Sequence, residues 1–378
     1  MKILSLTYEY PPIGGGGSVV AASLNETLVA AGISVEVVTS GMKGLSPAEV
    51  VRGVSVWRTS CWRRHRHYTT APELATTLLP AYRKAQQLIE SARPDLIHTH
   101  FVLPSGLVAY ALHRKYGVPY VLTAHGSDIP GYNPDRFGTL HILLGPLWKR
   151  VIVNAAAVTS PSKFLAGLIR RKANVPIDIV PNGYSPQAIQ GRQKRNLVLV
   201  VSRLFPRKGV QHFVESLRDM SSDWEFIVAG DGPYRAELEQ HTERARAPVK
   251  FIGFVDKQSL RALYEEARVL VFPSIRENFP MVLLEAMDAG CAVITTDAEG
   301  CAEVVGSAGI VVEKGNPRDI RGALHALICD PGRIESLSRR ARQRAELFRW
   351  PRIAAEYLGV FDSVLGRSTK TQARSIAS

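Results

Sequence analysis

Short apolar runs alternate with amphipathic stretches along the chain, and this pattern predicts β-strands separated by α-helices. The apolar run KILSL (2–6) opens the series, and an amphipathic helix follows a loop rich in proline and glycine. The apolar face of this helix consists of Val20, Leu24, Leu28 and Ala31, and Gly32 fits its C-terminal cap. Further strands are predicted at SVEVVTS (34–40), DLIHTH (95–100), PYVLTAH (119–125), AAVTS (156–160) and IDIVPNG (177–183).

A second series of the same kind begins near residue 197. It starts with the strand NLVLVVSRL, and a helix is predicted over residues 209–220. The strands that follow are WEFIVAGDG (224–232), VKFIGFV (249–255), RVLVFPS (268–274) and CAVITTD (291–297). Two helices close the series at 331–347 and 350–365, and Pro351 separates them because proline interrupts a helix.

This alternation predicts an α/β protein with two parallel sheets, each covered by helices on both faces. The polar stretch from Ser185 to Asn196 has no apolar period and fits a linker. We therefore expect two doubly wound domains, 1–184 and 185–349, with a last helix (350–366) that packs back on the first domain. Residues 367–378 are predicted to be a disordered tail. Ligands of such sheets bind beyond the carboxyl ends of the strands, so the cleft between the domains is the expected site.

Size and charge narrow the class of protein. The chain has 378 residues, more than one core usually organises, and a formal net charge of +13. This charge favours anionic partners such as a nucleotide, an acidic acceptor or a membrane surface, although a solvated arginine-rich surface is also consistent with it. We predict no nucleic-acid partner. The stretch CWRRHRHY (61–68) mixes cations with aromatic residues, which fits either an interfacial patch or a solvated loop.

The four cysteines and the hydropathy pattern bear on the compartment. Cys61, Cys291, Cys301 and Cys329 are far apart and have no metal-ligand spacing, which predicts reduced thiols. The N-terminal apolar run is too short for a signal peptide, and no uncharged apolar run reaches about 18 residues. We expect a cytoplasmic protein, with peripheral attachment to the inner face of the plasma membrane as a further hypothesis.

A glycine-rich loop, YPPIGGGGS, lies between the first strand and the first helix. Its glycines allow close approach of the backbone, and the helix N-terminus offers N–H groups to an anion. The loop does not match a dinucleotide-binding motif, because Val19 stands near the expected third glycine and the second strand ends in Thr39 and Ser40 without an acid. A flexible loop without a ligand is the alternative.

Candidate binding residues follow other predicted strands. Arg203 and Lys208 lie five residues apart after a strand and can converge on one diphosphate. His125, in TAHGSD, also stands at the end of a strand, where contact with a ligand is expected. His98 and His100 have no third metal ligand at a sensible spacing, and the chain contains no Asp-x-Asp pair. We therefore predict no metal and no separate cofactor.

Two glutamates flank a predicted helix start in ENFPMVLLEAMDAG. Pro280 fits the first helical position, and the helix is expected to run from Met281 to Ala289. The N–H groups from Phe279 to Val282 would then bind an anion, while Glu277 and Glu285 accept hydrogen bonds from hydroxyls. A sugar nucleotide carries hydroxyls on both sides of a diphosphate and matches this arrangement. The alternative for Glu285 is a core carboxylate with satisfied hydrogen bonds.

These motifs together resemble the retaining glycosyltransferases of family 4, also called glycosyl transferases group 1, over nearly the whole chain. The resemblance rests on the glycine loop, HGSD, VPNGYS, VSRLFPRKGV, VAGDGP, FIGFV, the Glu-x7-Glu element and FRWPRIAAEY. It implies a GT-B fold, in which two doubly wound Rossmann-like domains face a central cleft. The chain departs from the family at Asn278, Pro280, Cys301 and Ala302, and Pro280 removes one N–H donor.

The resemblance also implies roles for individual residues. Arg203 and Lys208 would hold the diphosphate, Glu285 the ribose, and Glu277 and His125 the transferred sugar. Gly15, Gly16 and Gly17 would let the loop approach the diphosphate or the acceptor, and Asn182 would lie at the floor of the cleft. Gly230 and Gly232 would line the nucleotide pocket, and the backbone around Phe254 would meet the base. Phe279, Met281 and Val282 would supply the N–H groups of the anion site.

The implied function is metal-independent transfer of a sugar, with retention of configuration, from a nucleotide donor such as a UDP- or GDP-sugar. The acceptor would be a sugar or a lipid-linked molecule, and the pathway cell-envelope polysaccharide or glycolipid synthesis. Two alternatives stay open: another GT-B enzyme such as a sugar-nucleotide epimerase, and a non-catalytic GT-B binding subunit. The presence of all four charged motif residues opposes the second.

Overall fold

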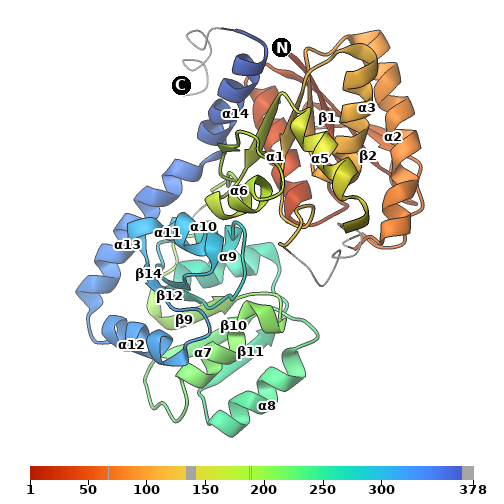
Figure 1. Ribbon diagram of the computed structural model, residues 1–378. Coiled ribbons are helices and arrows are strands. Elements are labelled where there is room, and N and C mark those ends of the chain that lie inside the picture. Colours follow the sequence, from red (N-terminus) through yellow and green to blue (C-terminus); the bar gives the residue numbers. More distant parts are fainter. Residues whose placement is uncertain (67, 133–141, 187, 189, 368–378) are drawn as a thin grey trace. The chain divides into compact units, whose positions relative to one another are not determined.

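The computed structural model describes residues 1–66, 68–132, 142–186, 188 and 190–367 (Figure 1). The chain divides into two compact units. The N-terminal unit comprises Met1–Gly183 and Trp350–Ser378, and the C-terminal unit comprises Tyr184–Arg349. The predicted disordered tail lies outside the described residues, apart from Arg367.

Among the described residues of the N-terminal unit, eight strands form one sheet in the order β3-β4-β2-β1-β5-β6-β7-β8. Their bounds are β1 (Lys2–Leu6), β2 (Ser34–Ser40), β3 (Ala48–Val51), β4 (Val54–Thr59), β5 (Leu96–His100), β6 (Tyr120–Thr123), β7 (Ala157–Ser160) and β8 (Asp178–Ile179). Strands β1 and β2 have the bounds that the apolar pattern predicts. Neighbouring strands run parallel from β4 to β8.

The hairpin β3–β4 departs from the expected parallel sheet, because β3 pairs antiparallel with β4 at the sheet edge. The two residues between the strands, Arg52 and Gly53, have φ angles of 48° and 82°. Two successive positive φ angles are typical of the tightest hairpin turns, whose twist matches that of the flanking strands. This local turn, which the sequence analysis missed, decides the strand direction.

The helical elements of the N-terminal unit cover its sheet. They are α1 (Gly16–Ala30), α2 (Ala71–Ala92), η1 (Val102–Gly106), α3 (Leu107–Tyr116), α5 (Gly145–Val153), α6 (Lys163–Arg170) and α14 (Trp350–Val364). Helix α14 lies beside α1 (Figure 1), and Tyr357 and Phe361 share a buried cluster with Leu24. A Cβ atom on Gly183 would lie 2.4 Å from the Trp350 ring, so only glycine permits this approach.

The C-terminal unit has a parallel sheet in the order β11-β10-β9-β12-β13-β14. The strands are β9 (Arg195–Val201), β10 (Glu225–Ala229), β11 (Val249–Gly253), β12 (Ala267–Phe272), β13 (Ala292–Thr296) and β14 (Ile310–Val312). The helical elements are η2 (Pro206–Lys208), α7 (Val210–Ser216), α8 (Arg235–Ala245), α9 (Lys257–Glu266), α10 (Met281–Asp288), α11 (Glu299–Val305), η3 (Gly306–Ala308), α12 (Pro317–Ile328), α13 (Pro331–Ala345) and η4 (Glu346–Phe348).

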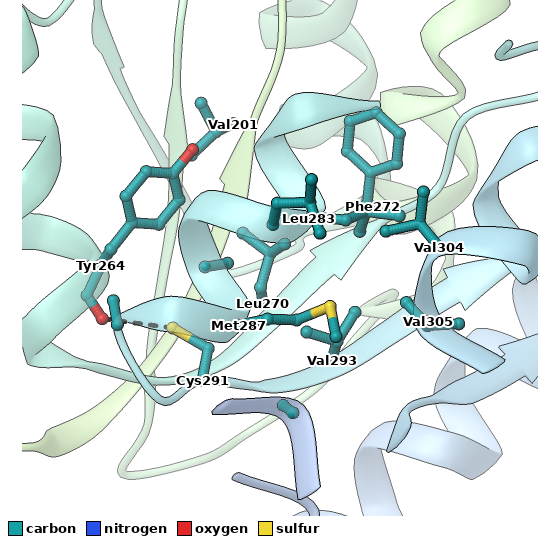
Figure 2. Packing of buried hydrophobic residues seen from close by; sticks show 14 of the residues in the cluster. Val201, Tyr264, Leu270, Phe272, Leu283, Met287, Cys291, Val293, Val304 and Val305 are labelled. Atoms are coloured by element: carbon teal, nitrogen blue, oxygen red, sulfur yellow. Dashed lines mark hydrogen bonds between the residues drawn. The ribbon is translucent and has the colours of Figure 1, made fainter. Parts of the chain in front are cut away.

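Helix α10 is anchored by a buried cluster of the C-terminal unit. Figure 2 shows Leu283 and Met287, one turn apart on α10, in the same cluster as Leu270 and Phe272 of β12. All four side chains are at most 2% exposed, so each contributes about 1.5–3 kcal/mol of burial. The Sγ atom of Cys291 donates to the Tyr264 carbonyl oxygen at 3.2 Å (Figure 2). This packing fixes where the helix N-terminus lies relative to β12.

Several predicted bounds are wrong. Pro280 is the N-cap of α10 and not its first residue, and Ala289 is the C-cap, because the chain leaves the helix ahead of Gly290 at φ 75°. The predicted helix at 209–220 is α7 (Val210–Ser216), preceded by the 3₁₀ turn η2. The strand at 177–183 is reduced to β8. The predicted linker loses Arg195 and Asn196, which begin β9.

Each sheet has one position where the strand order reverses. In the N-terminal unit it lies between β1 and β5, and in the C-terminal unit it lies between β9 and β12. Loops leaving two such strands turn to opposite faces of the sheet and leave a crevice between them, which is where ligands of doubly wound sheets bind. The segments after β1, β5, β9 and β12 are therefore the first places to look for a site.

Candidate active site

Lys208 and Glu277 meet at the strand-order reversal of the C-terminal unit. Lys208 ends the turn after β9 and Glu277 lies in the loop after β12, and the Lys208 Nζ atom forms an ion pair with Glu277 Oε1. The Ser274 hydroxyl also bonds to Glu277 Oε1, at 3.1 Å. The two charged side chains are only 14% and 12% exposed. Parallel strands that are adjacent in the sheet thus join residues that are 69 positions apart.

Gly209 allows the loop after β9 to pack closely against the loop after β12. Gly209, directly after Lys208, has a φ angle of 70°, and a Cβ atom there would lie 1.9 Å from the carbonyl oxygen of Pro273. The Ile275 N–H donates to the Arg207 carbonyl oxygen at 2.9 Å, which ties the same loops together. These backbone contacts fix the main chain of Lys208 relative to the loop that carries Glu277.

Arg203 is exposed at the carboxyl end of β9. Its guanidinium carbon lies 5.8 Å from the centre of the Phe205 ring, and the guanidinium of Arg207 lies at the same distance from that ring. Within the residues that the structure describes, no hydrogen bond or ion pair joins Arg203 to Lys208 or Glu277. The convergence of Arg203 and Lys208 on one diphosphate stays a prediction.

The N-terminus of α10 follows Glu277. No side chain caps this helix among the described residues, so the N–H groups of Met281 and Val282 in its first turn are not used by a cap. Phe279 is 9% exposed, and its ring packs edge-on against Phe348 with 5.8 Å between ring centres. Phe279 therefore offers its backbone and not its side chain, as the sequence analysis assumes.

Glu285 lies one turn into α10 and has a partner of its own. Its Oε2 atom accepts a hydrogen bond from the Tyr264 hydroxyl at 3.1 Å. Burial raises the pKa of the Glu285 carboxyl, while the Tyr264 bond and nearby cations lower it by less. No hydrogen bond connects Glu285 with Lys208 or Glu277 in the described part of the chain. The structure thus brings Lys208 and Glu277 together and leaves Glu285 on Tyr264.

Gly230 and Gly232 have a structural reason to be glycine. Gly230 has a φ angle of 135°, and a Cβ atom there would lie 1.8 Å from the Ser202 carbonyl oxygen. A Cβ atom on Gly232 would lie 2.3 Å from the Leu204 carbonyl oxygen. Both glycines let the turn after β10 pack against the loop that carries Arg203. Phe254, after β11, is 81% exposed.

The glycine loop of the N-terminal unit is shorter than predicted. Helix α1 begins at Gly16 with Gly15 as its N-cap, so Gly16 and Gly17 belong to the first helical turn. Cβ atoms on Gly15 and Gly16 would meet nothing within 4 Å, which leaves the helix N-terminus open. A Cβ atom on Gly17 would lie 2.6 Å from the Phe101 ring and 3.4 Å from the His125 ring.

His125 lies beside this helix start and bonds to a second histidine. Its Nε2 atom lies 3.0 Å from Nδ1 of His100, so one of the two nitrogens carries the shared proton. Desolvation lowers the pKa of His125 to about 3, and burial also lowers the pKa of His100. At neutral pH both imidazoles are therefore uncharged and act as hydrogen-bonding groups.

Asp128 orders the loop that carries His125. Its carboxylate accepts hydrogen bonds from the N–H groups of Val102 (2.9 Å), His125 (3.1 Å) and Gly126 (2.9 Å). Burial raises the pKa of Asp128 although these donors oppose the rise. Asn182 is half-buried next to Gly183, the last residue of this part of the N-terminal unit.

Four contributors escaped the sequence analysis. His100 was considered there only as a metal ligand, whereas the structure gives it a bond to His125. Ser274 and Tyr264, which contact the two motif glutamates, had no signal beyond their place at the end of a strand and of a helix. Gly300, in the first turn of α11, had no signal beyond being a glycine at a helix start. Its N–H donates to the Glu277 carbonyl oxygen at 3.2 Å, and a Cβ atom there would lie 1.6 Å from the Asn278 carbonyl oxygen.

The described residues contain neither a cluster of metal-binding side chains nor a helix that could cross a membrane. No group of three or more His, Cys, Asp or Glu side chains there could hold a metal ion. Among these residues there is also no helix with the length and apolar character needed to cross a membrane.

Comparison with known families gives two adjoining matches. The model described as Glycosyltransferase Family 4 matches residues 14–188, and the model described as Glycosyl transferases group 1 matches residues 185–344. An uncharacterized glycosyltransferase of Methanocaldococcus jannaschii is 28% identical over 391 residues, covering 96% of this chain and 98% of the relative. A putative teichuronic acid biosynthesis glycosyltransferase of Bacillus subtilis is 26% identical over 280 residues, covering 68% of this chain and 67% of the relative.

Solved structures share the fold. Sucrose-phosphate synthase from Thermosynechococcus elongatus superposes with a TM-score of 0.80 at 22% identity, over 97% of this chain and 100% of the other. The HepE protein of Anabaena in complex with UDP-glucose superposes with a TM-score of 0.73 at 19% identity, over 96% of this chain and 100% of the other. At such identities the likeness concerns the fold alone.

Proposed function

Because the chain belongs to glycosyltransferase family 4 and has the GT-B fold, we propose that it transfers a sugar from a nucleoside-diphosphate donor to an acceptor hydroxyl. We further propose that the transfer retains the anomeric configuration and needs no metal ion. The observation that carries the proposal is the contact between Lys208 and Glu277 at the strand-order reversal of the C-terminal unit.

The ion pair suggests how a donor binds. A diphosphate that reaches Lys208 competes with Glu277 for the ammonium group, because the diphosphate carries two negative charges and the carboxylate carries one. Exchange of this partner leaves the Glu277 carboxylate, still bonded to Ser274, able to accept a hydrogen bond from a sugar hydroxyl. Donor binding and the ordering of the sugar are then coupled through one residue pair.

The same groups stabilise the leaving group. Departure of a nucleoside diphosphate builds negative charge on its phosphate oxygens, and we assign Lys208 and the uncapped N–H groups of Met281 and Val282 to stabilise it. Charge stabilisation of this kind replaces what paired carboxylates and a divalent cation would supply. Arg203 is proposed as a second cation for the diphosphate, Glu285 as the ribose ligand and His125 as a neutral hydrogen-bonding group for the sugar.

The substrates are proposed from similarity and charge. UDP-sugars are the first donors to test, because a structural neighbour was solved with UDP-glucose, and GDP-sugars come next. A teichuronic acid glycosyltransferase among the relatives supports a role in cell-envelope polysaccharide or glycolipid synthesis. The net charge of +13 supports an acidic or lipid-linked acceptor at an anionic membrane surface.

A donor screen tests the proposal first. UDP-, GDP-, ADP- and dTDP-sugars are added separately and the melting temperature is measured, because a ligand that binds only the native state raises it. We expect the sugar nucleotide with one of these bases to raise the melting temperature most. Donor alone serves as the control for a sugar-nucleotide epimerase, which would isomerise it, and NMR of the product of transfer reports the anomeric configuration.

Lys208→Ala, assayed with the donor that the screen identifies, tests the role of the contact between Lys208 and Glu277. Loss of one preorganised electrostatic contact to the leaving group should lower kcat/KM about 100-fold or more. Lys250→Ala, which removes an exposed lysine of β11, is the matched control and should keep wild-type kinetics. Near-normal turnover of Lys208→Ala would reject the assigned role.

A further inference from the structure

The N-terminal unit contains an apolar cavity of about 290 Å³ beside the loop that carries His125. Four elements supply its apolar lining: Ala71, Leu74, Ala75 and Leu78 from α2, Leu103 and Pro104 from η1, Leu107 from α3, and Leu144 and Leu147 at α5. This volume is close to the lower end of the range for small-molecule sites. Nothing in the proposed transfer reaction uses these side chains.

The aliphatic lining is only partly covered, although Leu78 and Leu107 also pack against buried clusters of this unit. Leu74, Leu78, Leu107 and Leu147 are only half-buried, in contrast to the leucines that cover the sheet. On α2 the lining positions recur every three to four residues, so they form one stripe along the helix. A stripe that faces a cavity and stays accessible leaves apolar surface in water, which is unfavourable unless a ligand covers it.

Exposed apolar side chains continue this surface outside the cavity. Leu79 is 55% exposed, and Ile142 and Leu143, next to the lining residue Leu144, are 79% and 77% exposed. Apart from Phe254, no large hydrophobic residue in the described part of the chain is as exposed as Ile142 and Leu143. Leu79 and Leu143 adjoin the lining residues Leu78 and Leu144 in the sequence, and exposed apolar residues next to an apolar cavity are typical of a binding surface.

The polar members of the lining lead toward the candidate site. They are Tyr8, which follows β1, and Ser127 and Asp128, which follow β6. Asp128 also accepts the His125 N–H, so the cavity and the His125 loop share one residue. A molecule with its chain in the cavity would therefore have its polar end near the open N-terminus of α1 and His125.

Exposed cations accompany the elements that line the cavity. On α5, Lys149 and Arg150 are exposed and come after Leu147 and the buried Trp148. Arg64 is also exposed, and its backbone N–H donates to Oε1 of Glu73, a residue of α2, at 3.0 Å. The Gly14 N–H donates to the Arg66 carbonyl oxygen at 2.8 Å, which ties this basic stretch to the glycine loop. Figure 1 shows α2 and α5 in the N-terminal unit.

An aromatic residue accompanies these cations. Trp62 is 50% exposed, and the Arg64 guanidinium carbon lies 4.7 Å from the centre of its ring. The backbone N–H of Trp62 donates to the Thr76 hydroxyl at 3.0 Å. Exposed indole rings beside arginines are characteristic of surfaces that contact the headgroup region of a bilayer. Apolar surface flanked by cations and an aromatic ring complements a leaflet of anionic lipids.

From this we infer that the cavity binds one hydrocarbon chain of an anionic membrane lipid, while Arg64, Arg66, Lys149 and Arg150 contact the headgroups of the leaflet. The inference rests on the proposed function in one respect: it makes the membrane surface the place where the acceptor hydroxyl is presented to the N-terminal unit. The binding itself requires neither a donor nor turnover.

Two probes distinguish binding of the hydrocarbon chain in the cavity from binding of the lipid headgroups by the cations. Vesicles of phosphatidylcholine, alone and mixed with an equal part of phosphatidylglycerol, are sedimented with the protein at low and high salt. Decyl phosphate, kept below its micelle concentration, is titrated calorimetrically beside inorganic phosphate. The wild-type protein should sediment with the anionic vesicles and bind decyl phosphate, but not inorganic phosphate. Failure to bind decyl phosphate, or equal binding of inorganic phosphate, would overturn the inference.

Two double variants test the residues. Leu74→Gln with Leu107→Gln should weaken decyl phosphate binding about tenfold, because apolar surface is no longer buried against the chain. Arg64→Ala with Arg66→Ala should reduce vesicle binding at low salt most strongly, since the headgroup contribution is screened at high salt. If the leucine variant binds both probes as the wild type does, attachment is electrostatic only and the cavity is not a lipid site.

Two matched control variants remove apolar or cationic side chains that lie away from the cavity. Val311→Gln with Leu347→Gln changes two exposed apolar residues of the C-terminal unit, which are 40% and 41% exposed. Arg114→Ala with Lys115→Ala removes two exposed cations at the far end of α3, toward the amino edge of the sheet. Both should bind like the wild type. The thermal shift with the donor sugar, measured on every variant, reports the proposed function separately.

Discussion

The two strand-order reversals of this chain occupy the same position in their sheets but carry different chemistry. In the C-terminal unit the position holds a charged pair, Lys208 and Glu277, and an uncapped helix start. In the N-terminal unit it holds an open glycine-rich helix start beside the neutral imidazoles of His100 and His125. Topology therefore decides where a ligand can bind, whereas burial and side-chain charge decide which ligand. We propose that the first unit binds hydroxyls and apolar chains, and that the second binds a diphosphate.

Individual glycines give the sharpest test of this contrast, because Gly230 and Gly232 of the C-terminal unit are required by packing and Gly15 of the N-terminal unit is not. Gly230→Ala places a Cβ atom at 1.8 Å from a carbonyl oxygen, in a backbone conformation with φ 135°. We expect a loss of about 3 kcal/mol or more in the free energy of unfolding, measured with urea. Gly15→Ala meets nothing within 4 Å and should lose under about 1 kcal/mol. Equal losses would contradict the distinction.

Acid should destabilise the N-terminal unit through its histidines. Burial lowers the pKa of both His98 and His125 to about 3. Between that value and the ordinary pKa of 6.5 the unfolded state binds more protons than the folded state, so stability falls as the pH falls. Each group contributes a slope of up to about 1.4 kcal/mol per pH unit.

The slope is measured by urea unfolding across this pH window. His98→Gln should show a shallower slope than the wild type, because one of the buried groups no longer titrates. His65→Gln changes an exposed histidine of the same unit and should keep the wild-type slope. An unchanged slope in His98→Gln would mean that other groups dominate acid unfolding.

Glu285 tests whether the second motif glutamate serves the ligand or the core. Its folded pKa is raised, so the folded state holds its proton longer than the unfolded state does, and stability falls as pH rises through the interval above about 4.5. Glu285→Gln lacks this loss and should be as stable as the wild type at neutral pH, or more stable by about 1 kcal/mol.

The activity of the same variant decides its role. A ribose ligand predicts a raised KM for the donor in Glu285→Gln, measured beside an unchanged melting temperature. Wild-type kinetics in this variant would instead identify Glu285 as a core carboxylate that Tyr264 satisfies.

Phe254 should show the smallest effect. Its side chain is 81% exposed, so Phe254→Ala should change the free energy of unfolding by less than about 0.5 kcal/mol. Because the resemblance assigns base contact to the backbone here, the affinity for the nucleoside diphosphate should also be preserved. Calorimetric titration of the variant checks this, and a large loss would show that the ring itself stacks on the base.

Prediction from the sequence worked where the signal was local. Strands β1 and β2 have the predicted bounds because continuous apolar runs are read directly from the chain. The hairpin β3–β4 was missed because β3 is a partly exposed edge strand with a weak apolar pattern, and Pro280 was misplaced by one position because a proline is compatible with both the cap and the first helical residue. Both errors concern places where local preferences allow more than one answer.

The sequence by itself determined that strands and helices alternate through two series, and it identified the charged and glycine-rich segments at the ends of strands. Only the tertiary structure decided which of these residues meet: Lys208 with Glu277 across 69 positions, Tyr264 with Glu285 across 21, and His100 with His125 across 25. The physical reason is that hydrophobic periodicity is a property of neighbouring residues. Side-chain pairing and pKa depend instead on strand order and burial, which exist only once the sheets are formed.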